Sequence, residues 1–435
     1  MTDQPTQADL QNPDYSPPLS QAIPLGIQHV LAMFAGNVTV PIIIGGMAGL
    51  AGGDKIFLIQ MAMLFAGVAT LIQTIGFGPV GARLPIVQGT SFAFIPVMIP
   101  IVKGAGMGAL FGATIIGGIF HFLIGTFIGK IRHWLPPLVT GIVVMSIGLA
   151  LIPVGIKYMA GGAGPFVKDF GAWHHLILAG ITMLTILIVK FSFKGFTSAA
   201  AILIGLIVGY IVGWFTGDVS FARVGTAGWF SVPVPLKYGF EVNAAAVVGM
   251  CLMAVVSAIE TVGDISGITK GGANREATDK EISGGTMADG IGTAIAGLFG
   301  AMPNTSYSQN VGLIAFTGMM SRFVVTCGAI FLIIAGFIPK VGAVIAAMPN
   351  SVLGGASVIM FGMIVGAGIK LLSDVNLNRR NMLIIALALG IGLGLSAVPD
   401  ALKEFPTWLA LLLKTGLLPA ALIAVVLNMI LPEED

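Results

Sequence analysis

The stretch "PNTSYSQNVG" (303–312) is polar, yet it lies between the apolar runs "TAIAGLFGAM" and "LIAFTGMM". It carries a proline and an adjacent pair of amide side chains, which do not suit a lipid-facing helix. Non-helical backbone is tolerated inside a bilayer only where protein buries it or where it lines a cavity. The stretch therefore predicts half of a binding site at membrane depth. The alternative is a polar extramembrane loop between two short helices.

The composition indicates a polytopic membrane protein. Of the 435 residues, 56% are hydrophobic and only 9% are charged, whereas a soluble protein carries about 25% charged residues. Residues 1–22 are polar, rich in Pro and Gln, and contain no Lys or Arg. Because a cleaved signal peptide has a basic start, we expect these residues to form a disordered cytoplasmic N-terminal tail.

Apolar windows of roughly 20 residues mark the expected transmembrane spans. Fourteen are expected. Eleven begin near Pro24, Ile56, Met107, Trp134, His175, Phe196, Val242, Arg322, Val352, Met382 and Thr407, and three irregular ones cover 84–102, 283–301 and 303–320. An even number places both termini on one side. The majority of the 21 Lys and Arg residues then fall in loops on the side of the N-terminus, which predicts cytoplasmic termini.

A similar short motif occurs in each half of the chain. "GTSFAFIPV" (89–97) and "NTSYSQNVG" (304–312) both run Thr-Ser-aromatic-small, nearly half the chain length apart. With seven spans per half, the second half starts on the opposite face of the membrane, which describes an inverted repeat. The backbone N–H groups of two such segments would converge on one point near the midplane. The competing explanation is chance similarity of a five-residue pattern.

Several ionisable residues are expected at membrane depth. Glu260 follows a long uncharged run, Asp264 lies one helical turn later on the same face, and Asp289 lies inside a span of small residues. A carboxylate inside the membrane is costly and hence a functional candidate. Alternatively, Glu260 and Asp264 begin the charged loop that follows, and Asp289 is a hydrogen-bond partner between helices. His29 in the first span fits a structural partner or a proton carrier equally well.

No phosphate-binding loop, zinc-ligand spacing or nucleophile motif is found in the sequence. It therefore predicts neither a membrane enzyme nor an ATP-driven pump, and no cofactor, metal or nucleic-acid partner.

The stretch "QNVGLIAFTG" (309–318) matches the signature of the nucleobase–ascorbate transporters, also called the nucleobase–cation symporter-2 family. That signature is Q/E-N-x-G-x-x-x-x-T followed by Arg, Lys or Gly. The resemblance extends along nearly the whole chain through "GIQHVLA", "QGTSFAF", "AIETVGD" and "MADG".

The resemblance implies an all-α fold of fourteen spans, as a 7+7 inverted repeat with short β-segments in spans 3 and 10. It implies a core domain at 23–133 and 241–345, and a gate domain at 134–240 and 346–435. Such a protein would be a homodimer in a bacterial-type cytoplasmic (inner) membrane, surrounded by lipid. It would move its core as an elevator and couple uptake to protons.

The resemblance also implies the site. Glu260 would accept hydrogen bonds from ring N–H groups, Gln309 would pair with the base edge, and Phe94 would stack on it. Ala93 and Ser308 would offer backbone contacts. The residues that would shape the site or its proton coupling are His29, Asp264, Asp289 and Asn310.

A carboxylate, an amide and an aromatic ring together complement an oxidised purine such as xanthine, which has ring N–H donors, carbonyls and a planar face. Gln309 resembles the xanthine and uric acid branch, whereas Ala93 replaces a polar residue of many xanthine-selective relatives and leaves room for a more oxidised base. Two alternatives stay open: a uracil or broad-range nucleobase permease, and an anion exchanger or channel of the same architecture.

Overall fold

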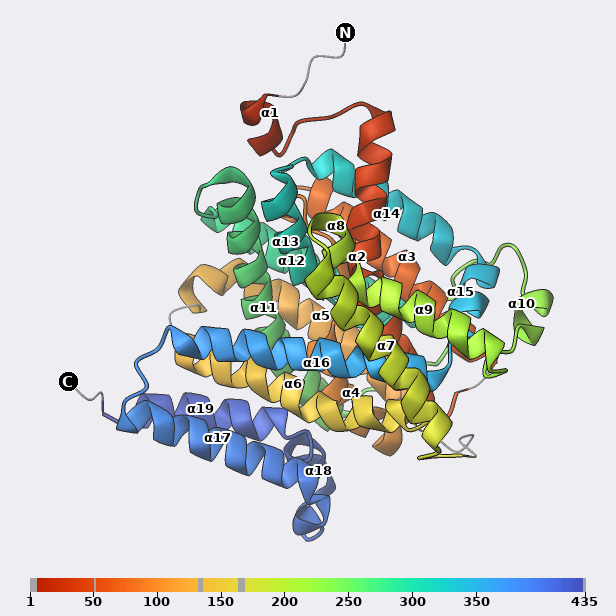
Figure 1. The fold of residues 1–435 in the computed structure, drawn as a ribbon. Coiled ribbons are helices and arrows are strands. Elements are labelled where there is room, and N and C mark those ends of the chain that lie inside the picture. The colour runs from red at the N-terminus through yellow and green to blue at the C-terminus, as the bar shows by residue number, and fades with distance from the viewer. Residues whose placement is uncertain (1–5, 51, 132–135, 163–168, 433–435) are drawn as a thin grey trace.

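The structure is a computed structural model that describes residues 6–50, 52–131, 136–162 and 169–432 (Figure 1). Helices dominate it. The elements of the first half are α1 (Gln7–Gln11), α2 (Leu19–Met47), α3 (Gly53–Ile75), β1 (Gln88–Thr90), η1 (Phe92–Phe94), α4 (Ile95–Gly104), α5 (Gly106–Ile131), α6 (Pro137–Met159), α7 (Trp173–Ser192), α8 (Gly195–Ala199), α9 (Ala201–Phe215) and α10 (Ala222–Thr226). The predicted boundary between core and gate at 133–134 lies outside the described residues.

The second half follows the same order of long helix, short strand and half-length helix. Its elements are α11 (Ala244–Ala273), α12 (Asp279–Leu298), β2 (Asn304–Ser306), α13 (Ser308–Thr317), α14 (Arg322–Gly336), α15 (Pro339–Ala346), α16 (Asn350–Ser373), α17 (Arg379–Ala397), η3 (Pro399–Leu402), α18 (Thr407–Leu413) and α19 (Leu417–Ile430).

Within the described residues, eight helices are long and apolar enough to cross a membrane. They are α2, α3, α5, α6, α7, α11, α16 and α17. The pair α14 and α15 makes a ninth if it is one span, although it bends by 84° where Pro339 begins α15. The remaining apolar helices are shorter because strands and turns interrupt them. The chain is thus a multi-pass integral membrane protein.

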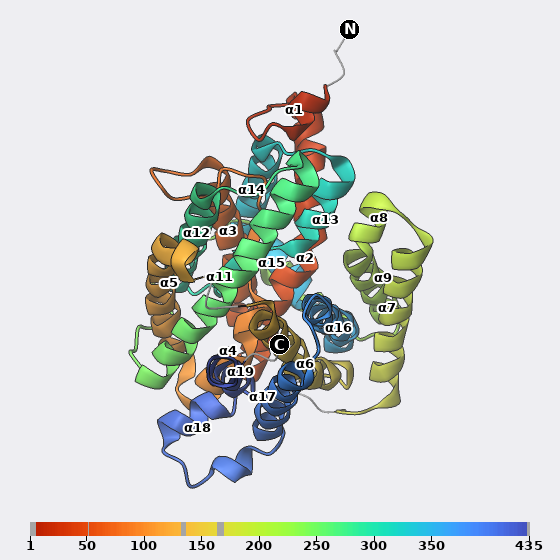
Figure 2. The same ribbon diagram turned by 90° about the vertical axis from the view of Figure 1, so that its left-hand side faces the viewer.

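The long helices pack as two groups. In one group, α5 packs on α12, α3 on α14, and α2 on both α3 and α14. In the other, α6 runs along α16, α7 contacts α9 and α16, and α17 contacts α19. Figure 2 shows α7, α8 and α9 on one side of the molecule and α3, α5 and α12 on the other, with α6 and α16 between them.

Small residues let the helices of the first group approach closely. A Cβ atom added at Gly118 of α5 would overlap the backbone of Gly290 and Ala294 on α12, and one added at Gly290 would overlap the backbone of Phe122. Such contacts suit helix pairs in lipid, where close backbone packing replaces the hydrophobic effect as the source of association.

The N-terminal tail is ordered where it is described, so the expectation of disorder is wrong for residues 6–18. Leu10 and Tyr15 pack in a small apolar cluster beside the turn between α13 and α14. Met320 N donates to Leu10 O at 2.7 Å, and Arg322 Nε lies 2.7 Å from Asp14 Oδ1. The tail is polar on average, yet it supplies apolar side chains and carbonyl acceptors to that turn. These contacts offset the chain entropy that the tail loses when it is ordered.

Candidate functional site

The two short strands are buried and pair with each other. β1 and β2 pair antiparallel, with Gly89 opposite Thr305 and Gln88 opposite Ser306. The pairing gives hydrogen-bond partners to backbone N–H and C=O groups that would otherwise lack them in the buried interior. η1 and α4 follow the first strand and α13 follows the second, so half-helices start where the strands end.

Asn37 and Tyr307 hold the strand pair in place. Asn37 of α2 accepts from Thr90 N through its Oδ1 at 2.9 Å, and its backbone oxygen accepts from Thr90 Oγ1 at 2.7 Å. Tyr307 Oη donates to Thr90 O at 2.8 Å. Both side chains pack so closely on Gly89 that a Cβ there would lie 2.8 Å from each. The glycine is required by this close approach.

A cavity of about 1140 Å³ opens beside the strand ends. Its polar wall comes from β1, β2, α11 and the start of α13, and its apolar wall from α6, α16, α17, α18 and α19. The residues of the polar wall are Thr90, Glu260, Asp264, Thr305, Ser306, Ser308 and Gln309. Among the described residues that line this cavity, two are carboxylic acids and none is Lys, Arg or His.

The two carboxylates of α11 have different surroundings. Asp264 accepts hydrogen bonds from Ser306 Oγ and Ser308 Oγ, both at 2.6 Å. Both oxygens of Asp264 are therefore engaged by the protein, and they fix the start of α13. Glu260 lines the cavity one turn away and interacts with the side chain of Thr305. It has more capacity left to accept hydrogen bonds from a bound molecule.

Gln309, Ser308 and Ala93 also lie on the cavity wall. Ser308 and Gln309 form the first turn of α13, whose N-terminal N–H groups lack partners in their own helix. Ala93 is 4% exposed and adds no polar group. An amide, helix N–H groups and a carboxylate thus border one space, and together they can donate to and accept from a planar polar molecule.

The structure places Phe92, and not the expected stacking residue Phe94, on the cavity wall. Phe94 is 1% exposed and belongs to the apolar core. Phe92 lines the cavity and makes an edge contact with Phe361 of α16, with ring centroids 5.6 Å apart. The two rings diverge because residues 92–94 form a 3₁₀ turn, in which residues two apart point to different sides.

Asp289 is buried outside the cavity and serves as a hydrogen-bond hub. Its carboxylate accepts from Gln73 Nε2 at 2.8 Å and from the side chains of Gln88 and Thr261. These contacts join α3, β1, α11 and α12. The structure therefore favours the interpretation of Asp289 as a hydrogen-bond partner between helices.

His29 and Asn310 form a second buried link, between α2 and α13. Asn310 Nδ2 lies 3.0 Å from His29 Nδ1 and donates to His29 O at 3.1 Å. Neither residue is on the cavity wall, but the link positions the helix that carries Gln309.

Sequence reasoning overlooked the supporting residues Asn37, Gln73, Gln88, Thr261 and Tyr307, and also Phe92. A signal existed for some of them, because Asn37, Gln73 and Gln88 are uncharged polar residues within apolar surroundings, and Tyr307 belongs to the repeated motif.

Comparison with known proteins decides the family. The family model described as "Permease family" matches residues 20–401. The chain belongs to this permease family. The resemblance to the nucleobase–ascorbate transporters is thereby confirmed, and the permease is a transporter and not an enzyme.

Relatives cover nearly the whole permease. A putative purine permease of Clostridium perfringens is 39% identical over 95% of this chain and 91% of its own. The xanthine permease of Bacillus subtilis is 38% identical over 94% of this chain and 93% of its own. The uric acid transporter UacT of Escherichia coli is 37% identical over 93% of this chain and 84% of its own.

A solved structure shares the fold. The transmembrane domain of the cyanobacterial bicarbonate transporter BicA aligns with a TM-score of 0.61 at 15% identity, over 94% of this chain and 98% of that one. At this identity the likeness shows the fold alone.

Proposed function

We propose that this permease takes up an oxidised purine base, xanthine or uric acid or both, together with protons. One observation carries the proposal. Glu260, Gln309 and Phe92 lie on the wall of a single cavity beside the paired strands. A carboxylate can accept from ring N–H groups, an amide can pair with adjacent N–H and C=O groups, and an aromatic ring can cover the planar face. The names of the relatives point to the same substrates.

The charge of the cavity argues against an anion exchanger. Its described wall carries Glu260 and Asp264 and no basic side chain. An inorganic anion would face these carboxylates without a compensating charge, which is unfavourable. A neutral base with N–H donors suits the wall better.

We infer fourteen spans in a 7+7 inverted repeat. The nine spans found by length and composition are joined by five shorter or more polar helices, α4, α9, α12, α13 and α19. The helix contacts support the repeat. When each helix is replaced by its counterpart in the other half of the chain, one pair of contacting helices becomes another pair of contacting helices. The contact α5–α12 then corresponds to α14–α3, α11–α5 to α2–α14, and α7–α9 to α17–α19.

We propose the two domains expected from the sequence, and the two packing groups support this division. The core is 23–133 and 241–345, the gate is 134–240 and 346–435, and residues 1–22 precede them. The groups meet where α4 and α11 contact α6 and α18, where α2 contacts α9 and α16, and where α8 and α10 contact α13 and α15, and each of these contacts is smaller than the main helix pairs within a group. An elevator movement of the core past the gate is the motion that such a seam allows. We further propose a homodimer in the cytoplasmic (inner) membrane with both termini in the cytoplasm.

A competition assay tests the substrate class. Uptake of labelled xanthine by cells that express the permease is measured against excess uric acid, hypoxanthine, guanine and uracil. We expect strong competition by uric acid and weak competition by uracil. Dominant competition by uracil would favour the pyrimidine alternative, and no uptake of any base would contradict the proposal.

A further inference from the structure

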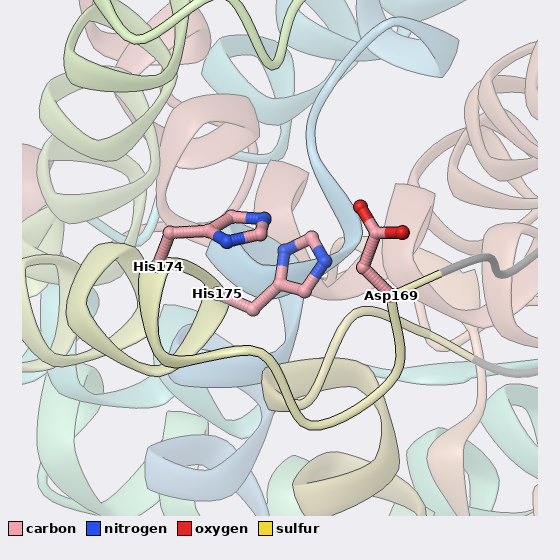
Figure 3. Close-up of side chains that lie close together, drawn as sticks. All are labelled: Asp169, His174 and His175. Atoms are coloured by element: carbon pink, nitrogen blue, oxygen red, sulfur yellow. The ribbon is translucent and has the colours of Figure 1, made fainter.

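Three potential metal ligands meet at the start of α7, away from the base cavity. Asp169 lies in the turn that leads into the helix, and His174 and His175 are in its first turn. The turn is held by backbone hydrogen bonds from Ala172 N to Asp169 O at 3.0 Å and from His175 N to Ala172 O at 3.1 Å. Figure 3 shows the two imidazole rings side by side with the Asp169 carboxylate next to them.

The geometry suits a bound cation. One ligand atom from each of the three side chains lies within 4.8 Å of the other two. The imidazole centroids are 4.1 Å apart. Asp169 is exposed and both histidines are partly exposed, so an ion can reach them from solvent.

A second observation lies beside the cluster. His175 also lines a small cavity of about 250 Å³ with Asp218, Asn350 and Ser351. The Ser351 hydroxyl is buried and has no hydrogen-bond partner among the described residues. Lys55 lines the same cavity with Arg223 close to it, and the carboxylates of Asp169 and Asp218, which both act on His175, balance these two positive charges. The cavity can hold water or a further ligand for an ion bound to His175.

We propose that Asp169, His174 and His175 form a binding site for a divalent transition-metal ion, with Zn²⁺ as the best match. Two imidazole nitrogens and one carboxylate oxygen are typical ligands of Zn²⁺, whereas Mg²⁺ and Ca²⁺ prefer oxygen alone. With ligand atoms about 2.1 Å from the ion, a tetrahedral site places them about 3.4 Å apart. The three ligand atoms, which lie within 4.8 Å of one another, would close to that spacing by side-chain rotation on binding the ion. The ion would tie Asp169 to the first turn of α7.

This proposal does not rest on the purine assignment, because the residues of the cluster do not line the base cavity. Its test is binding to the purified permease in detergent, produced without a polyhistidine tag and stripped with a chelator. Titration with Co²⁺ is followed by visible absorption, and Zn²⁺ is then added in competition. We expect one ion per chain, with a spectrum typical of tetrahedral or five-coordinate nitrogen and oxygen ligation, displaced by Zn²⁺.

The variants His174→Ala, His175→Ala and Asp169→Asn should each weaken Zn²⁺ binding at least tenfold. Asp374→Asn is the matched control for Asp169→Asn, because Asp374 is exposed and is not part of the cluster; it should bind as the wild type does. Zn²⁺ should also raise the thermal unfolding midpoint of the wild type but not of the double variant His174→Ala/His175→Ala. A folded wild type that binds no ion stoichiometrically, or a double variant with wild-type affinity, would overturn the proposal.

Discussion

At the scale of residues, the polar side chains of the site have two roles. Some face the cavity, and others hold the surrounding elements in place. Asp264 and Asp289 are occupied by hydroxyl and amide donors of the protein itself. Glu260 lines the cavity with fewer protein partners. The carboxylate with spare capacity is therefore the one expected to contact a substrate.

The first prediction concerns that carboxylate. Glu260→Gln keeps the side-chain size but presents amide donors toward the ring N–H groups of a base. Such a mismatch costs about 1–3 kcal/mol, or roughly ten- to a hundredfold in affinity. Binding of xanthine and uric acid to the purified variant measures it, with Glu404→Gln, at an exposed position away from the cavity, as the control. Unchanged binding would remove Glu260 from the substrate contacts.

Ala93 should control selectivity by volume. It lies on the cavity wall with 4% of its surface exposed. Ala93→Asn narrows the cavity, so uric acid, which carries an additional carbonyl at position 8, should lose more affinity than xanthine. One such contact discriminates by about 1–3 kcal/mol. The ratio of the two inhibition constants in wild type and variant is the measurement. The same ratio in both proteins would show that residue 93 does not contact the base.

At the scale of elements, two three-residue strands carry the site, and they are stable only because their neighbours brace them. β1 is held by Asn37 of α2, by Tyr307 beyond β2, and through Gln88 by Asp289 of α12. An isolated pair of such short strands would not persist.

Gly89 provides a test of this bracing. A methyl group at position 89 would lie 2.6 Å from Met33 Cε and 2.8 Å from Asn37 Oδ1. Overpacking of this kind costs about 1–3 kcal/mol. We expect Gly89→Ala to lower the thermal unfolding midpoint in detergent and to weaken base binding. Gly180→Ala is the matched control, since nothing lies within 4 Å of a Cβ there. Equal behaviour of the two variants would mean that β1 is less tightly packed than the structure has it.

At the scale of the whole molecule, the helices form two groups, and the cavity beside the strand ends lies between them. The strand ends contribute the polar wall and helices such as α6 and α16 the apolar wall. In the proposed elevator movement, the core group of helices would carry the polar wall of the cavity and a bound base with it.

Proton coupling is a property at this scale. If the proton gradient drives uptake, a protonophore that collapses it should abolish accumulation of labelled base. Replacing sodium with choline should leave accumulation unchanged. Accumulation that instead follows the sodium gradient would contradict proton coupling but would leave the base site intact.

The sequence by itself determined the membrane character, the order of the long helices and the positions of the two irregular segments, because hydropathy and short motifs are local properties. It also located Glu260, Asp264 and Gln309, since charged and amide side chains stand out in apolar surroundings. Only the tertiary structure decided which aromatic ring faces the cavity, because one turn of 3₁₀ helix sends Phe92 and Phe94 to different sides. The partners of Asp289 and the docking of the N-terminal tail on Arg322 were likewise decided there. Gln73 and Asp289 are 216 residues apart, and Asp14 and Arg322 are 308 apart, so no local pattern in the sequence links them.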